Sequence, residues 1–134
     1  MDNKQNNYAN FIKENKIVKS SVNGLYRFLV LWIIKYNGKI HGYSIMKELD
    51  KFFVNLIDEK AIKKSSPSKI YPILRQMENF NLINGSWEYH DKKKIKYYQI
   101  TEKGEFFIIY LFQKVLLFEE NSQWKLMIDD LLSD

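Results

Sequence analysis

Apolar residues recur at helical spacing along most of the chain. The first apolar segment covers residues 22–36 and ends at the Asn-Gly pair at 37–38, which is typical of a helix C-terminus. Ser20 or Ser21 is its predicted N-cap. Residues 28–34 are apolar on every face, so a helix here must be covered on all sides. Because a small domain can hardly do this alone, we expect a partner subunit to help.

Two further helices are predicted, each with one apolar stripe. The second extends from Gly42 to Phe53. The third begins at Ser66-Pro67, because serine favours the N-cap position and proline the first helical position. Pro72 lies inside the third helix, where it removes one backbone hydrogen bond and should bend or tighten the second turn. The stripes consist of Ile45, Met46, Leu49, Phe52 and Phe53 in the second helix, and of Ile70, Ile73, Leu74, Met77 and Phe80 in the third.

A β-hairpin is predicted after the third helix. Residues 82–90 and 95–101 are rich in tryptophan, tyrosine and isoleucine, which is typical of strands. Residues 91–94 connect them as a basic tip with the sequence Asp-Lys-Lys-Lys. The core of the hairpin is predicted to contain Trp87, Tyr89 and Tyr98.

A long helix is predicted at the end of the chain. Thr101 is its candidate N-cap, and Glu102 suits the positive end of a helix. The segment from Phe106 to Phe118 is apolar on most faces, and residues 119–122 are expected to kink or break the helix.

Three helices, a hairpin and a long helix follow one another in the order of a winged helix-turn-helix. In that fold the third helix enters the DNA major groove and the hairpin flanks it. We therefore predict a mainly α fold with a β-hairpin: a winged helix-turn-helix plus a long C-terminal dimerisation helix. The expected domains are an N-terminal arm at residues 1–21, a DNA-binding domain at 22–103 and a dimerisation helix at 104–134.

The composition narrows the function classes. The 134 residues are enough for one domain, and the absence of cysteine excludes disulfides, thiol catalysis and cysteine-ligated metal. The two histidines, His41 and His90, are not spaced as a metal site or a catalytic triad, so we expect no enzyme and no cofactor. No apolar stretch is long enough for a membrane span, and residues 1–10 lack the apolar core of a secretory signal. A cytoplasmic protein without membrane contact is expected.

Charge is unevenly distributed along the chain. Residues 1–38 have a net charge of +4, residues 39–103 of +5 and residues 104–134 of −4. A basic body with an acidic tail predicts a polyanionic partner, although a solvated lysine-rich surface gives the same totals.

Several short motifs follow one another between residues 41 and 104. They are His41-Gly42-Tyr43-Ser44-Ile45, Ser66-Pro67, Ile70-Tyr71-Pro72-Ile73-Leu74, Leu82-Ile83 and Tyr97-Tyr98-Gln99-Ile100-Thr101-Glu102-Lys103-Gly104. In this order they resemble the PadR family of transcriptional regulators, over about residues 22–104. The resemblance implies a homodimeric DNA-binding repressor whose C-terminal helix dimerises. The hairpin tip and residues 69–70 depart from the usual family pattern.

The predicted DNA contacts lie at the start of the second helix, around the third helix and on the hairpin. A helix N-terminus suits a phosphate, so the hydroxyl of Tyr43 is expected to contact one. Side chains near the start of a recognition helix usually reach bases, although Tyr71 also borders the apolar stripe. The hairpin lysines are expected to contact phosphates or the minor groove. The full set is Tyr43, Lys63, Lys64, Ser66, Ser68, Lys69, Tyr71, Arg75, Lys92, Lys93, Lys94 and Lys96.

The predicted dimer contacts are apolar residues of the first and last helices. They are Leu25, Trp32, Phe107, Tyr110, Leu111, Leu117, Trp124, Ile128 and Leu131. The same region could instead form a cavity for an apolar small-molecule effector, lined by Trp32 and Trp124.

A two-fold dimer predicts a double-stranded DNA operator that is an inverted repeat, with half-sites about one helical turn or a multiple of it apart. Arg75 is the only arginine among the predicted contacts, so guanine contacts should be scarce and the site A·T-rich. Two alternatives stay open. One is a winged-helix protein–protein interaction module without DNA binding, and the other is an effector-binding sensor that uses the dimer cavity.

Overall fold

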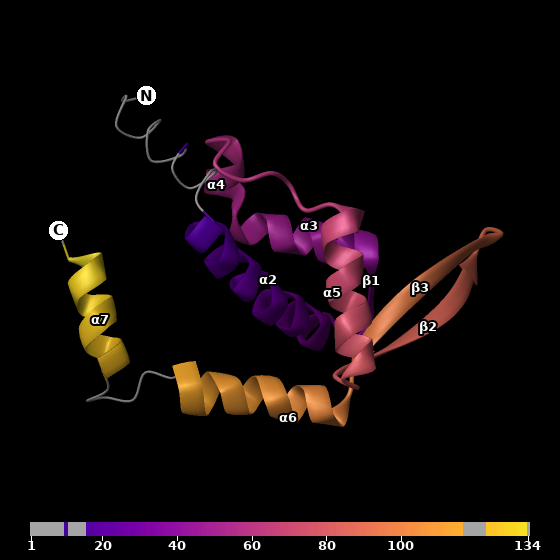
Figure 1. Cartoon of the computed structure of the whole chain (residues 1–134). Coiled ribbons are helices and arrows are strands. Elements are labelled where there is room, and N and C mark those ends of the chain that lie inside the picture. The colour runs from indigo at the N-terminus through magenta and orange to yellow at the C-terminus, as the bar shows by residue number, and fades with distance from the viewer. Residues whose placement is uncertain (1–9, 11–15, 117–122, 134) are drawn as a thin grey trace.

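The computed structural model of this chain describes residue 10, residues 16–116 and residues 123–133. Helices α2, α3 and α5 pack together, a hairpin projects away from them, and α6 follows the hairpin (Figure 1). The elements are α2 (Lys16–Asn37), β1 (Ile40–His41), α3 (Gly42–Phe52), α4 (Val54–Asp58), α5 (Pro67–Asn79), β2 (Ile83–His90), β3 (Lys93–Ile100), α6 (Glu102–Tyr110), the π-helix η1 (Leu111–Leu116) and α7 (Gln123–Leu132). The predicted mainly α fold with a hairpin wing is confirmed.

The core lies between α2, α3, α5 and the base of the hairpin, and one residue of α6 joins it. Its buried side chains are Tyr26, Val30, Leu31, Ile33, Ile34, Ile40, Ile45, Leu49, Ile70, Ile73, Leu74, Met77, Ile83, Tyr98 and Ile108. The predicted stripes of α3 and α5 are confirmed at Ile45 and Leu49 and at the four apolar residues of α5 up to Met77. Phe52 and Phe80, at the last turns of their helices, are instead about half exposed because the core ends before them.

The helix α2 begins at Lys16, well before the predicted start at residue 22. The predicted capping role of Ser20 and Ser21 is therefore wrong, since both lie inside the helix. No glycine or proline separates Lys16 from Ser21, so nothing in this segment interrupts the backbone hydrogen bonds of a helix.

Two helix starts use caps that the sequence only partly indicated. The backbone N–H of Ser44 donates to Nδ1 of His41, which caps α3 at 3.1 Å. Ser66 is the N-cap residue of α5, as predicted, but its side chain does not accept a hydrogen bond from the helix. Its hydroxyl lies 3.1 Å from the hydroxyl of Ser68 instead. Pro72 lies inside α5, as predicted.

Within the described residues the sheet has three antiparallel strands in the order β1-β3-β2. His90 of β2 pairs with Lys93 of β3, so only Asp91 and Lys92 form the turn. Both turn residues have positive φ, 50° and 68°, as a two-residue type I′ hairpin turn requires. The predicted four-residue tip is therefore too long, because Lys93 and Lys94 belong to β3.

The hairpin is packed on the protein only at its base. Tyr98 is 3% exposed, which confirms its predicted place in the core. Trp87 and Tyr89 are 56% and 73% exposed, so their predicted burial is wrong. The hairpin extends away from the helices beyond its base (Figure 1), and a projecting pair of strands has no second layer to cover these rings.

The C-terminal region starts as predicted. The backbone N–H of Gly104 donates to the hydroxyl oxygen of Thr101 at 2.9 Å, which confirms Thr101 as the N-cap of α6. The helix changes to the π-helix η1 at Leu111, and the helical backbone of α7 starts at Gln123. The predicted kink at 119–122 lies outside the described residues. No residue of α7 is buried in the single chain. Among the helices described, none has the length and apolar character needed to cross a membrane.

Stability should decrease as the pH rises from about 10 to about 12. Burial, with a smaller effect of Glu78, raises the pKa of Tyr98 to about 12 from an ordinary value of 10.0. Below pH 10 the hydroxyl is protonated in both states. Above it the unfolded chain loses the proton first, so the free energy of unfolding falls by on the order of 2 kcal/mol. Urea unfolding across this range should show a smaller decrease for Tyr98→Phe, whereas equal decreases would contradict the assignment.

Candidate nucleic-acid interface

The helix α5 exposes one face along its whole length. Ser68, Pro72, Arg75 and Asn79 are all exposed, while the apolar stripe on the other side of α5 is buried. Arg75 makes no hydrogen bond or ion pair with the part of the chain that the structure describes. Its planar guanidinium is thus free to bind an external acceptor such as a base edge or a phosphate.

Lys69 does not share this exposed face. Its ammonium nitrogen lies 4.0 Å from the centre of the Tyr26 ring on α2. Burial lowers the pKa of Lys69, although Asp50 partly opposes this effect. The side chain therefore contacts the core side of the domain, unlike its neighbour Ser68.

Tyr71 lies against the first residue of α3. A Cβ atom added to Gly42 would be 2.6 Å from the hydroxyl oxygen of Tyr71, so a side chain here would displace this ring. Tyr43, which follows Gly42 in α3, is 61% exposed. The ammonium nitrogen of Lys47 lies 4.7 Å from the centre of the Tyr43 ring. The structure thus places both predicted tyrosines at the N-terminus of α3, whose backbone N–H groups favour anions.

The loop before α5 is fixed to α3 by Ser65. The backbone N–H of Ser65 donates to Oδ1 of Asp50 at 2.9 Å, and its hydroxyl donates to the carbonyl of Met46 at 3.1 Å. Lys63 and Lys64, just before this anchor, are exposed. Two positive charges therefore lie in the loop that leads into α5.

The wing, which is the hairpin formed by β2 and β3, has exposed lysines at its tip. Lys92, Lys93 and Lys94 are exposed, and among the described residues none of them pairs with a carboxylate. Lys94 lies 4.8 Å from the ring centre of Trp87. Lys96 differs, because its ammonium group pairs with the Glu78 carboxylate at 2.8 Å and its side chain is only 26% exposed.

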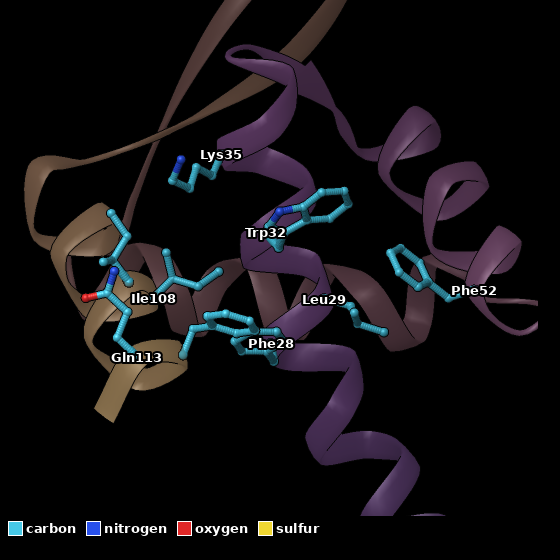
Figure 2. A pocket seen from close by; sticks show the side chains of 9 residues that line it. Phe28, Leu29, Trp32, Lys35, Phe52, Ile108 and Gln113 are labelled. Carbon is cyan, nitrogen blue, oxygen red and sulfur yellow. The ribbon is translucent and has the colours of Figure 1, made fainter. Parts of the chain in front are cut away.

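An apolar cavity of about 370 Å³ lies between α2, α3, α6 and η1. Figure 2 shows Trp32 and Phe28 of α2 and Ile108 of α6 around it. Lys35 lies at its edge and pairs with Glu105 at 3.6 Å. The lining residues are Phe28, Leu29, Trp32, Lys35, Phe52, Ile108, Ile109, Phe112 and Gln113.

Most of the predicted dimer contacts are accessible in the single chain. Leu111 and Ile128 are partly buried, and Leu117 lies outside the described residues. The exposed ones are Leu25, Trp32, Phe107, Tyr110, Trp124 and Leu131. Exposed apolar side chains thus lie on both α2 and α6. In the described ranges, no group of three or more histidine, aspartate or glutamate residues could hold a metal ion.

Packed helices, an exposed recognition helix (here α5) and a two-stranded wing define the winged helix-turn-helix class. Residues 30–108, more than half of the chain, match the Transcriptional regulator PadR-like family, and the chain belongs to that family. The resemblance of the sequence motifs is thereby confirmed. A family of transcriptional regulators also agrees with the expectation of a non-enzymatic protein. The comparison with curated proteins found no match.

Solved structures of the same fold come from several organisms. A PadR-like transcriptional regulator from Bacillus cereus is 24% identical, with a TM-score of 0.62, and covers 86% of this chain and 98% of its own. A transcriptional regulator described as putative from Thermoplasma acidophilum is 22% identical, with a TM-score of 0.62 and coverages of 86% and 97%. Bacillus subtilis PadR, solved in complex with operator DNA, is 17% identical, with a TM-score of 0.55. It covers 78% of this chain, which spans only 56% of that protein.

Proposed function

We propose that this protein is a transcriptional regulator that binds double-stranded DNA through α5 and the wing. The observation that carries the proposal is the exposed face of α5, with Arg75 available for an external acceptor. Three further lysines on the wing tip supply positive charge to the same domain. The complex of Bacillus subtilis PadR with operator DNA supports this interpretation of the fold.

In this proposal each part of the domain has one role. Ser68 and Arg75 face the major groove, where a short hydroxyl and a guanidinium can discriminate bases. The wing lysines contact phosphates without regard to sequence. The N-terminus of α3, with Tyr43, meets a further phosphate, and Lys63 and Lys64 add charge beside it. A DNA partner also implies that the protein acts in the cytoplasm.

Retention on immobilised duplex DNA tests the proposal directly. The protein should bind at low salt and be released as salt increases, because phosphate contacts release counterions. Selection of bound sequences from a random duplex pool should then yield an inverted repeat. Absence of retention at low salt would instead favour the protein–protein interaction module.

The operator should be A·T-rich, with half-sites about one helical turn or a multiple of it apart. Two recognition helices related by a two-fold axis reach successive major grooves. With a single arginine on the exposed face of α5, most discrimination should come from DNA shape. Footprinting on the selected sequence checks this, and one asymmetric G·C-rich protected site would contradict it.

We also propose that the protein is a homodimer that represses by steric occlusion. The support is the exposed apolar surface on α2 and α6, together with the unburied α7. Sedimentation should show a dimer, and Tyr110→Asp with Leu131→Asp should shift it toward monomer. Both residues are more than half exposed in the single chain, so these changes leave its core intact. Phe80→Asp, at an equally exposed apolar residue outside the proposed interface, should leave the dimer unchanged.

The apolar cavity favours a second role as an effector site. Its lining is aromatic and aliphatic apart from Lys35 and Gln113, which suits an apolar small molecule. Alternatively, side chains of the second subunit fill part of this cavity in the dimer, and no effector binds there. Quenching of Trp32 fluorescence by an apolar probe in the dimer, absent in Trp32→Ala, would support the effector site.

A further inference from the structure

One ion pair connects the recognition helix α5 to the wing. The ammonium group of Lys96 on β3 donates to Oε1 of Glu78 on α5 at 2.8 Å. Both side chains are 26% exposed, so the pair is more enclosed than the other ion pairs of the described chain. The contact joins two residues that are 18 positions apart in sequence, one on the wing and one on α5.

Gly85 makes room for this contact. A Cβ atom at Gly85 would collide with Cε of Lys96 and would be 3.1 Å from Oε2 of Glu78. Gly85 pairs with Tyr98 across the hairpin, two positions from the pair formed by Trp87 and Lys96. The lysine therefore crosses the face of β2 through the space above Gly85, and a side chain at this position would displace it.

Two aromatic rings also lie close to the ammonium group of Lys96. The ammonium nitrogen of Lys96 lies 5.4 Å from the ring centre of Tyr98 and 5.7 Å from that of Trp87. These contacts limit the positions that the charged group can take. The ammonium group of Lys96 therefore makes its contacts within the domain, with Glu78 and with two aromatic rings.

We propose that the Lys96–Glu78 pair, with the space left by Gly85, is a positioning device that holds the wing at a fixed angle to α5. Lys96 then serves DNA recognition without touching DNA, in contrast to the wing-tip lysines. Its effect on DNA binding rests on the proposed function, whereas its effect on the wing does not. An enclosed ion pair is a weak argument for stability, so we assign this pair a role in fixing the relative position of the two elements.

The sign of one substitution distinguishes this role from simple electrostatics. Removing the negative charge of Glu78 near a phosphate backbone should tighten DNA binding if only charge matters. If Glu78 positions the wing, its removal should weaken operator binding instead. The two roles thus predict opposite results for the same isosteric variant, Glu78→Gln.

Operator binding is compared for Glu78→Gln, Lys96→Met, the double variant and Lys96→Arg. We expect each of the first two to weaken binding roughly three- to tenfold, with the double variant no weaker than either single one. Lys96→Arg, which keeps a cation, should retain most of the affinity. The salt slope should stay unchanged, because every phosphate contact remains in place. Glu48→Gln, which breaks the exposed pair with Lys51 inside α3, is the matched control and should show little change.

Two sets of binding results would overturn the proposal. If Lys96→Met lowers the salt slope by about 0.9 per subunit while Glu78→Gln tightens binding, Lys96 is a phosphate contact and the proposal is wrong. Unchanged affinity in Glu78→Gln and Lys96→Met would also overturn it. Thermal unfolding of each variant confirms that the compared proteins are folded.

A measurement without DNA separates this inference from the proposed function. The chain has no cysteine, so cysteines introduced at Asp58 and Lys93 can carry two spin labels. Both positions are exposed, one on α4 and one on the wing. Labelled chains diluted with unlabelled ones should give a narrow interspin distance distribution that broadens in Glu78→Gln and Lys96→Met. An unchanged distribution would overturn the proposal even if the protein binds DNA, and broadening would support it even if the protein does not.

Discussion

Replacing Gly104 with alanine should lower the free energy of unfolding by about 2–4 kcal/mol. Gly104 is the third residue of α6, where an added Cβ would collide with the carbonyl oxygen of Leu82 and lie 2.9 Å from Cγ1 of Ile100. The carbonyl is held in place, because it also accepts a hydrogen bond from the backbone N–H of Thr101 at 3.0 Å. The collision is with fixed backbone, so α6 or the segment just before β2 must move.

The sign of this effect is diagnostic. In an ordinary helix interior the same substitution stabilises by roughly 0.5–1 kcal/mol, because alanine restricts the unfolded chain. Gly24 of α2 is the matched control, since an added Cβ there meets nothing within 4 Å. Urea unfolding should therefore show Gly24→Ala unchanged or more stable and Gly104→Ala less stable. If both variants were stabilised, the start of α6 could not lie so close to the carbonyl of Leu82.

Helical periodicity predicted the body of the domain because each apolar pattern lies within a single element. Ile45 and Leu49 recur one turn apart on α3, and both are fully buried. The stop at Asn37 and the cap at Thr101 follow from local backbone chemistry, which a sequence displays directly. The identity and order of the elements could be predicted for the same reason.

The burial of the outer hairpin and the start of α2 could not be predicted so well. Trp87 and Tyr89 have the composition of a buried strand, yet no layer covers the outer part of the hairpin. The start of α2 at Lys16 shows a related problem, because a serine in a helix interior looks the same in sequence as a serine cap. In each case the outcome depends on what lies beside the element in space.

The candidate site was predicted as a set of lysines, serines and tyrosines together with Arg75, and the structure separates its positive charges into two groups. Lys69 faces the Tyr26 ring and Lys96 pairs with Glu78, whereas Arg75 and the wing-tip lysines stay accessible. The one sequence signal for the Lys96 contact is Gly85, a glycine within a strand, which often marks a close approach. Its partner on α5 follows only from the packing of the hairpin base on that helix.

Arg75→Ala should weaken binding to the operator by about 1–3 kcal/mol per base contact and bind scrambled DNA almost normally. The guanidinium can form two parallel hydrogen bonds with one base edge, and its place on a rigid helix fixes its direction. The measurement is a pair of titrations, with operator and with scrambled duplex, at two salt concentrations. Lys114→Ala, at an exposed cation on η1 outside the predicted DNA contacts, controls for the removal of one charge.

Replacing Lys92, Lys93 and Lys94 together with alanine should weaken binding to both duplexes alike. These exposed ammonium groups are point charges, so the salt slope should fall by up to about 0.9 for each phosphate that each subunit no longer neutralises. Arg75→Ala should leave most of that slope in place, since a base contact releases few counterions. The two variants thus separate sequence recognition from backbone attraction in one set of titrations. If the lysine variant lost sequence preference while Arg75→Ala kept it, the roles of wing and helix would be reversed. If neither variant altered binding, this surface would not contact DNA, and the winged helix would be a protein interaction module instead.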